Sequence, residues 1–86
     1  MTFRKHVEEI VQTVLLEAIK QQGYVLETEI CNMICEKYNI SSYIVRGTLG
    51  RIYPGMSLLK RRMSNDLKRF YGLKTKGYPI VYMPEQ

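Results

Sequence analysis

Five basic side chains lie within the twelve residues LKRRMSNDLKRF (59–70), interspersed with apolar residues at helical spacing. Lysine and arginine neutralise phosphates, and the forked guanidinium group of arginine also fits guanine. Asn65 lies among these cations, and an asparagine amide can form two hydrogen bonds with adenine. These residue types and their spacing predict a surface that holds a polyanion, and nucleic acid is the polyanion that they fit best.

The net charge of +5 comes from the second half of the chain. Residues 1–40 hold four basic and six acidic side chains, whereas residues 60–76 hold seven basic side chains and one acidic side chain. This asymmetry indicates an anionic partner on one face of the protein. The candidate nucleic-acid-binding residues are Lys60, Arg61, Arg62, Asn65, Lys68, Arg69, Lys74 and Lys76, with Arg46 and Arg51 as further phosphate contacts. Arg61, Asn65 and Arg69 are the candidates for contacts with base edges.

Apolar periodicity predicts four helices around these residues. The first spans 3–22, with Thr2 as its N-cap and Gly23 at its end. A short run of strand formers at 24–26 precedes a second helix over about 28–38, capped by Thr28. A weaker third helix, over 41–53, contains Gly47 and Gly50. A fourth, over about 57–71, has an apolar face and an opposing basic face.

The last residues of the chain, LKTKGYPIVYMP (73–84), predict a hairpin, because a glycine separates two short runs of strand formers. The predicted strands are 73–76 and 80–83, and Lys74 and Lys76 would share one face of the first. The expected fold is a single domain over residues 1–86. It is α+β and mainly helical with a small sheet, in the order α-β-α-α-α-β-β.

This order of elements resembles the winged helix-turn-helix superfamily. The residues that carry the resemblance are GYVLETEI (23–30), LLKRRMSNDLKRFYG (58–72) and LKTKGYPIVYMP (73–84). The resemblance implies that the short strand pairs with a C-terminal hairpin, the wing, here 73–83. It also implies that the helix before the wing, here 57–71, enters the DNA major groove. The extra helix leaves segment 41–53 as the alternative recognition helix.

The stretch IVRGTLGRIY (44–53) has the GxxG spacing that looks like the backbone-gripping loop of KH domains. Close packing of the two glycines against the first helix is the other reading.

These patterns predict a non-enzymatic DNA-binding protein, a regulator of transcription or of a mobile element such as a phage or plasmid. Double-stranded DNA is favoured, and six phosphate contacts would give a slope near −5 for log affinity against log salt concentration. One alternative is a binder of single-stranded DNA or RNA that assists replication. The other is a protein-interaction module on a winged-helix scaffold.

Enzymatic activity has little support in the sequence. His6 is the single histidine, and no Ser/His/Asp or Cys/His grouping and no Walker-type loop are present. Cys31 and Cys35 are too few to hold a metal, so no cofactor or metal is expected.

A cytoplasmic location is expected, near the nucleoid or, for a viral protein, in the host cytoplasm. No apolar run approaches the ~18 residues of a membrane span, and the N-terminal residues turn acidic too soon for a signal peptide. The first helix could also form a homodimer, because Leu16 and Ile19 leave apolar surface away from its main apolar side.

Overall fold

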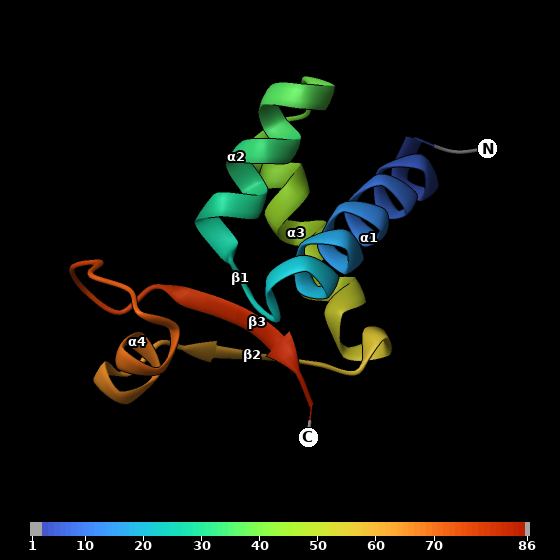
Figure 1. The fold of residues 1–86 in the computed structure, drawn as a ribbon. Coiled ribbons are helices and arrows are strands. Elements are labelled where there is room, and N and C mark those ends of the chain that lie inside the picture. Colours follow the sequence, from blue (N-terminus) through green and yellow to red (C-terminus); the bar gives the residue numbers. More distant parts are fainter. Residues whose placement is uncertain (1–2, 86) are drawn as a thin grey trace.

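The computed structural model describes residues 3–85, so the predicted N-cap Thr2 lies outside the described residues. The elements in chain order are α1 (Phe3–Gln22), β1 (Val25–Leu26), α2 (Glu27–Tyr38), α3 (Ser42–Ile52), the 3₁₀ turn η1 (Tyr53–Met56), β2 (Leu58–Arg62), α4 (Asn65–Tyr71) and β3 (Ile80–Pro84). Helices α1 to α3 lie on one side of a small sheet, and α4 lies near the end where β2 stops and β3 starts (Figure 1). The predicted class, mainly helical with a small sheet, is confirmed.

The helix ends follow from local backbone chemistry. Gly23, Asn39 and Gly72 end α1, α2 and α4 with positive φ angles of 83°, 53° and 69°, the left-handed conformation that glycine and asparagine tolerate best. The Ser41 hydroxyl accepts a backbone N–H of the first turn of α3. The predicted cap at Thr28 is wrong, because α2 begins at Glu27, directly after β1, and has no side-chain cap.

The three strands form an antiparallel sheet of order β1-β3-β2. In the central strand β3, Tyr82 lies between Val25 of β1 and Lys60 of β2. Paired residues of antiparallel strands point to the same face, so these three side chains face the helices. The enclosed core between the helices and this face consists of Val7, Val11, Leu15, Val25, Ile30, Cys31, Ile34, Val45, Leu49, Leu58 and Tyr82.

The predicted continuous basic helix over 57–71 is wrong. Residues 58–62 are the strand β2, and the helix is limited to Asn65–Tyr71, with Ser64 as its N-cap. The physical reason is pairing with a distant segment, because all five residues of β2 are in register with β3, from Leu58 opposite Pro84 to Arg62 opposite Ile80. These ladder contacts override the local helical periodicity. The order of elements is therefore α-β-α-α-β-α-β.

One of the two strands of the predicted hairpin is confirmed. The second predicted strand corresponds to β3, but residues 73–79 form a loop and no strand. The partner of β3 is β2, and α4 and the loop 73–79 are inserted between these two paired strands. The predicted recognition helix thus consists of one strand of the hairpin and the first part of its insert.

The insert is held against the outer face of the sheet, away from the helical core. Met63 and Val81 are fully buried outside the main core. The ring of Tyr71 in α4 stacks on that of Tyr24 with centroids 4.0 Å apart. Of the apolar face predicted for a long helix, Met63 is buried, whereas Phe70 is 80% exposed. α4 is therefore tied to the second face of the sheet through Tyr71, while Leu59 on that face stays 40% exposed.

The buried hydroxyl of Tyr82 makes stability depend on pH in the alkaline range. Burial and its hydrogen bond to Glu27 raise the pKa of Tyr82 far above its usual value. A tyrosine in the unfolded chain ionises near pH 10, so this contribution is complete below that pH. Above it, stability falls by up to ~1.4 kcal/mol per pH unit. We expect Tyr82→Phe to flatten this fall and to cost about 1–2 kcal/mol at neutral pH.

Urea unfolding at a series of pH values measures both effects. Tyr43→Phe is the matched control, because Tyr43 is 87% exposed and should change neither quantity. An alkaline loss of stability that is as steep in Tyr82→Phe as in the wild type would contradict the assignment.

Candidate nucleic-acid interface

The outward face of α3 has no side chain at positions 47 and 50, and the exposed ring of Tyr43 lies at its N-terminal end. The helix packs inward through Val45 and Leu49, which are fully buried. At 100° per residue, Gly47 and Gly50 fall on the opposite side, and both are exposed. A Cβ at Gly50 would meet nothing within 4 Å, and one at Gly47 would meet only Arg51 Nη1, at 3.9 Å.

Both interpretations of the two glycines made from the sequence are wrong. They are not packed against α1, because the space around them is open. The likeness to a KH loop is also wrong, because both lie within the helix and not in a loop. Each glycine lowers helix stability by about 1 kcal/mol relative to alanine in a helix interior. No contact within the described residues explains why glycine occupies either position.

Two arginines flank this bare face, and each is paired with a carboxylate. Arg46 Nη1 lies 3.4 Å from Glu27 Oε1, and Arg51 Nη2 lies 3.3 Å from Glu8 Oε2. Their side chains remain 53% and 40% exposed, so a phosphate can reach them but must compete with the carboxylates. We call Arg46, Gly47, Gly50 and Arg51 the α3 surface.

Glu27 contacts two of the predicted cations, and sequence reasoning missed it. Its carboxylate accepts a hydrogen bond of 3.0 Å from the Tyr82 hydroxyl and lies 3.4 Å from Arg46 and 3.6 Å from Lys60 Nζ. Only 13% of its side chain is exposed. Glu27 opens α2, where the partial positive charge of a helix N-terminus also favours a carboxylate. No local pattern signals these partners, because they come from α3, β2 and β3.

The alternation of strand side chains separates the three basic residues of β2. Lys60 points toward the helices and Glu27. Arg61 faces the other way and lines a groove of about 410 Å³ between the outer face of the sheet and α4. Arg62 Nη1 donates a hydrogen bond of 3.1 Å to the carbonyl oxygen of Tyr78 and so anchors the loop 73–79.

The remaining predicted cations lie on α4 and the loop after it. Lys68 Nζ is 4.7 Å from the ring centroid of Tyr78, and Arg69 forms an exposed ion pair with Asp66, a kind of pair that contributes little to stability. Asn65 opens α4 and is exposed. The last two lysines, Lys74 and Lys76, are exposed in the loop.

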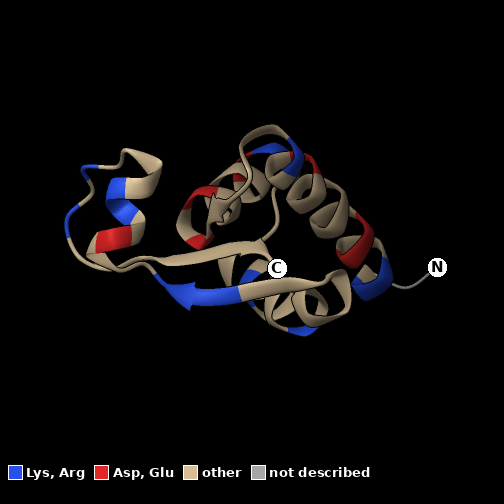
Figure 2. Ribbon diagram, turned by 60° about the horizontal axis from the view of Figure 1, so that its bottom comes forward, with Lys and Arg blue, Asp and Glu red and all other residues tan. Residues whose placement is uncertain are grey.

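The cations gather away from the acidic segments. Basic segments lie along β2, α4 and the following loop, whereas most acidic segments lie on α1 and α2 (Figure 2). The single basic helical face predicted for Arg61, Asn65 and Arg69 does not exist, because Arg61 is in β2. The structure instead gives the α3 surface and a second set of cations, spread over β2, α4 and the following loop. We call this set the insert surface, although adjacent residues of β2 point to opposite faces of the sheet: Arg61, Arg62, Asn65, Lys68, Arg69, Lys74 and Lys76.

Comparison with protein-family models finds no match, and neither do searches of curated proteins and of solved structures. Over residues 3–85, no helix is long and apolar enough to span a membrane. The same residues contain no group of three or more His, Cys, Asp or Glu side chains that could hold a metal. Cys31 and Cys35 are free thiols, and burial raises the pKa of Cys31.

Replacing the exposed glycines of α3 by alanine should stabilise the protein. We expect Gly47→Ala and Gly50→Ala each to raise the free energy of unfolding by up to about 1 kcal/mol, because alanine restricts the unfolded chain and has room in the helix. The measurement is chemical denaturation. Gly72→Ala, at a φ of 69°, is the contrasting control and should destabilise the protein. A loss of stability in the α3 variants would show that the fold itself needs these glycines.

Proposed function

We propose that this chain is a winged-helix protein that binds double-stranded DNA and catalyses no reaction. The order helix, strand, helix, helix, strand, strand, with the sheet order β1-β3-β2, supports this fold family. In this reading β2 and β3 form the wing, and α4 with the loop 73–79 is an insertion within it. The recognition helix is then α3, the alternative that the sequence left open, and not residues 57–71.

The single observation that carries the proposal is the bare outward face of α3 between two arginines. A helix enters the major groove when its exposed face lets the groove walls approach. The two glycines leave positions 47 and 50 of that face without side chains, next to the exposed ring of Tyr43. Arg46 and Arg51 at its borders would contact phosphates and so orient the helix.

The insert surface would supply the electrostatic part of the binding. Its cations would contact phosphates beside the recognition helix. Lys60 would also contact a phosphate once its ion pair with Glu27 is broken. The protein is 42 Å long, which corresponds to about 12 base pairs at 3.4 Å per base pair. One molecule could therefore contact a full helical turn of DNA.

We propose a regulatory role in transcription or in a mobile element, in the cytoplasm, since DNA binding without catalysis controls access to a site. A second copy could pair through α1, where Leu16 is 48% exposed. A groove of about 300 Å³ between α1 and α2, lined by Val14, Ala18 and Met33 among others, lies nearby. A homodimer of this kind would favour DNA sites with two-fold symmetry.

The salt dependence of duplex binding tests this function. Each phosphate contact contributes about 0.9 to the slope of log affinity against log salt concentration. We expect Lys74→Ala/Lys76→Ala to make this slope shallower by about 2, without loss of stability, because both lysines are exposed in the loop. Lys20→Ala/Lys37→Ala removes the same charge from α1 and α2 and is the matched control. The proposal fails if both double variants behave alike, or if the wild type binds no duplex at micromolar concentration and ~100 mM salt.

The glycine variants test the contact made by α3. Gly47→Ala/Gly50→Ala adds two methyl groups to the face that is proposed to meet the groove. We expect duplex affinity to fall by about tenfold or more, equivalent to ~1.4 kcal/mol, although the variant is more stable. Fluorescence anisotropy measures the affinity. An unchanged affinity would remove α3 from the interface.

A further inference from the structure

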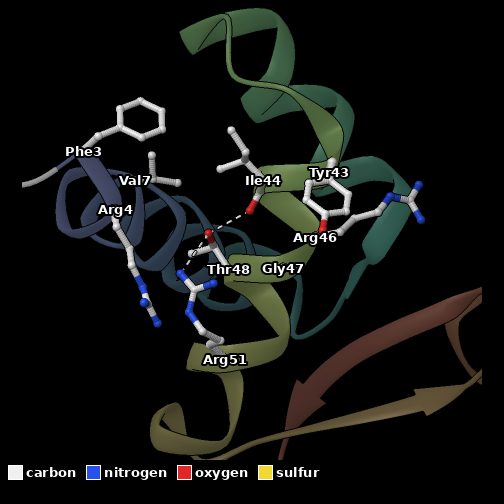
Figure 3. Close-up of a pocket in the computed structure, with 9 residues that line it drawn as sticks. All are labelled: Phe3, Arg4, Val7, Tyr43, Ile44, Arg46, Gly47, Thr48 and Arg51. Atoms are coloured by element: carbon white, nitrogen blue, oxygen red, sulfur yellow. Dashed lines mark hydrogen bonds between the residues drawn. The ribbon is translucent and has the colours of Figure 1, made fainter.

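A groove of about 610 Å³ lies between the first turns of α1 and the helix α3. Figure 3 shows Phe3 and Val7 on α1, with Ile44 and Tyr43 on the facing helix. The groove borders the α3 surface, because Arg46, Gly47 and Arg51 also line it. A ligand seated on α3 would therefore extend directly into it.

The walls of this groove are apolar and open to water. Phe3 is 62% exposed, Tyr43 is 87% exposed and Ile44 is 36% exposed. Large apolar side chains gathered around one hollow are more informative than the same residues scattered singly. An exposed aromatic ring in a wall of this kind, such as that of Phe3, offers a stacking surface for a nucleobase.

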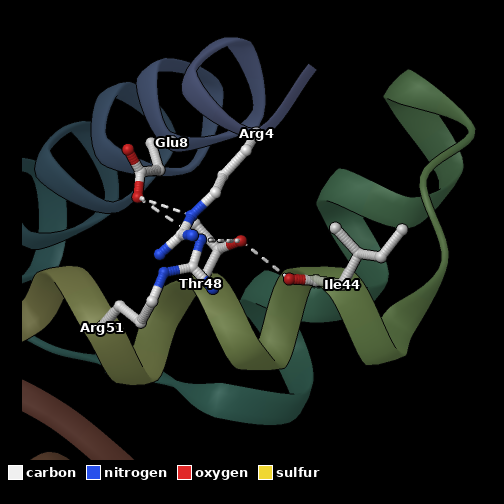
Figure 4. A network of polar contacts seen from close by, with 5 residues as sticks. All are labelled: Arg4, Glu8, Ile44, Thr48 and Arg51. Atoms are coloured by element: carbon white, nitrogen blue, oxygen red, sulfur yellow. Dashed lines mark hydrogen bonds and ion pairs between the residues drawn. The ribbon is translucent and has the colours of Figure 1, made fainter. Parts of the chain in front are cut away.

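At the other edge of the groove, the carboxylate of Glu8 holds two guanidinium groups in place. Arg4 Nε lies 4.0 Å and Arg51 Nη2 lies 3.3 Å from the same oxygen of Glu8. Arg51 also donates a 3.4 Å hydrogen bond to Thr48 Oγ1, and the Thr48 hydroxyl donates to the Ile44 carbonyl oxygen at 2.8 Å (Figure 4). One carboxylate thus serves two arginines, which leaves an excess positive charge beside the apolar walls.

We infer that the α1–α3 groove binds an unpaired nucleotide next to a duplex, with its base against Phe3 and its phosphate at Arg4 and Arg51. This inference rests on the proposed function, because the duplex on α3 would bring the strand to the groove. An acidic peptide would also satisfy the arginines. The exposed rings and the position beside α3 favour a nucleotide, whose flat base and phosphate match the two kinds of wall.

The test compares a short blunt duplex with the same duplex carrying a single-stranded overhang that contains 2-aminopurine. We expect the wild type to bind the overhang duplex at least about tenfold more tightly, as one stacked base allows, and to change the 2-aminopurine fluorescence. Phe3→Ala should lose this gain and the fluorescence change while keeping its affinity for the blunt duplex. Phe70→Ala removes another exposed phenylalanine, on α4, and should keep the gain.

The possible outcomes separate the two proposals. Equal affinity for blunt and overhang duplexes, with no fluorescence change, overturns the nucleotide site and leaves duplex binding intact. Absence of binding to either DNA overturns both. A gain that Phe3→Ala and Phe70→Ala lose equally overturns the placement of the base in this groove. Displacement of the overhang, but not of the blunt duplex, by a glutamate-rich peptide at equal concentration overturns it in favour of a protein partner.

Discussion

The mutual orientation of the helices and the sheet depends on one nearly enclosed carboxylate. Glu27 opens α2 with 13% of its side chain exposed, and a charge removed from water in this way is costly unless it is paired. Its partners Tyr82, Arg46 and Lys60 come from β3, α3 and β2. These contacts constrain four elements around one charge, and the apolar core then fills the space between them.

This constraint also shapes the electrostatics of the proposed interface. Arg46 and Lys60 are held in position by Glu27, but the same contact offsets part of their charge. The cations of α4 and the loop 73–79 have no such buried carboxylate among their partners in the described part of the chain. Attraction of a polyanion over a distance would come mainly from this insert, and α3 would provide the shaped contact. Under this proposal the glycines of α3 would serve that contact at the expense of helix stability, a pattern typical of functional surfaces.

The sequence was informative where structure is local. The span of α1, its end at Gly23 and the last residues of the helices predicted over 28–38 and 57–71 depend on periodicity and backbone conformation within a few residues, and all were predicted. The exposure of the basic side chains could also be predicted, because charged side chains remain at the surface in almost any fold. Their grouping in space could not be predicted.

The failures arose where distant residues decide the structure. The spacing of Leu59, Met63 and Leu67 fits a helix, but β2 pairs with β3, which lies beyond α4 and the loop 73–79. Because of that pairing, Arg61 lies on the outer face of the sheet and not on the predicted helix. The role of Glu27 depends on partners from three other elements, and nothing adjacent in the sequence indicates them.

A two-dimensional ¹H–¹⁵N NMR titration with duplex DNA tests the central claim most directly, because it observes every amide of the unaltered protein. If α3, β2 and the loop 73–79 bind DNA, the shifts of residues 42–52, 58–62 and 73–79 change together and in proportion to bound DNA, while those of the facing sides of α1 and α2 around Val14 and Met33 stay constant. Changes confined to that α1–α2 groove, or no changes at saturating DNA, would contradict it.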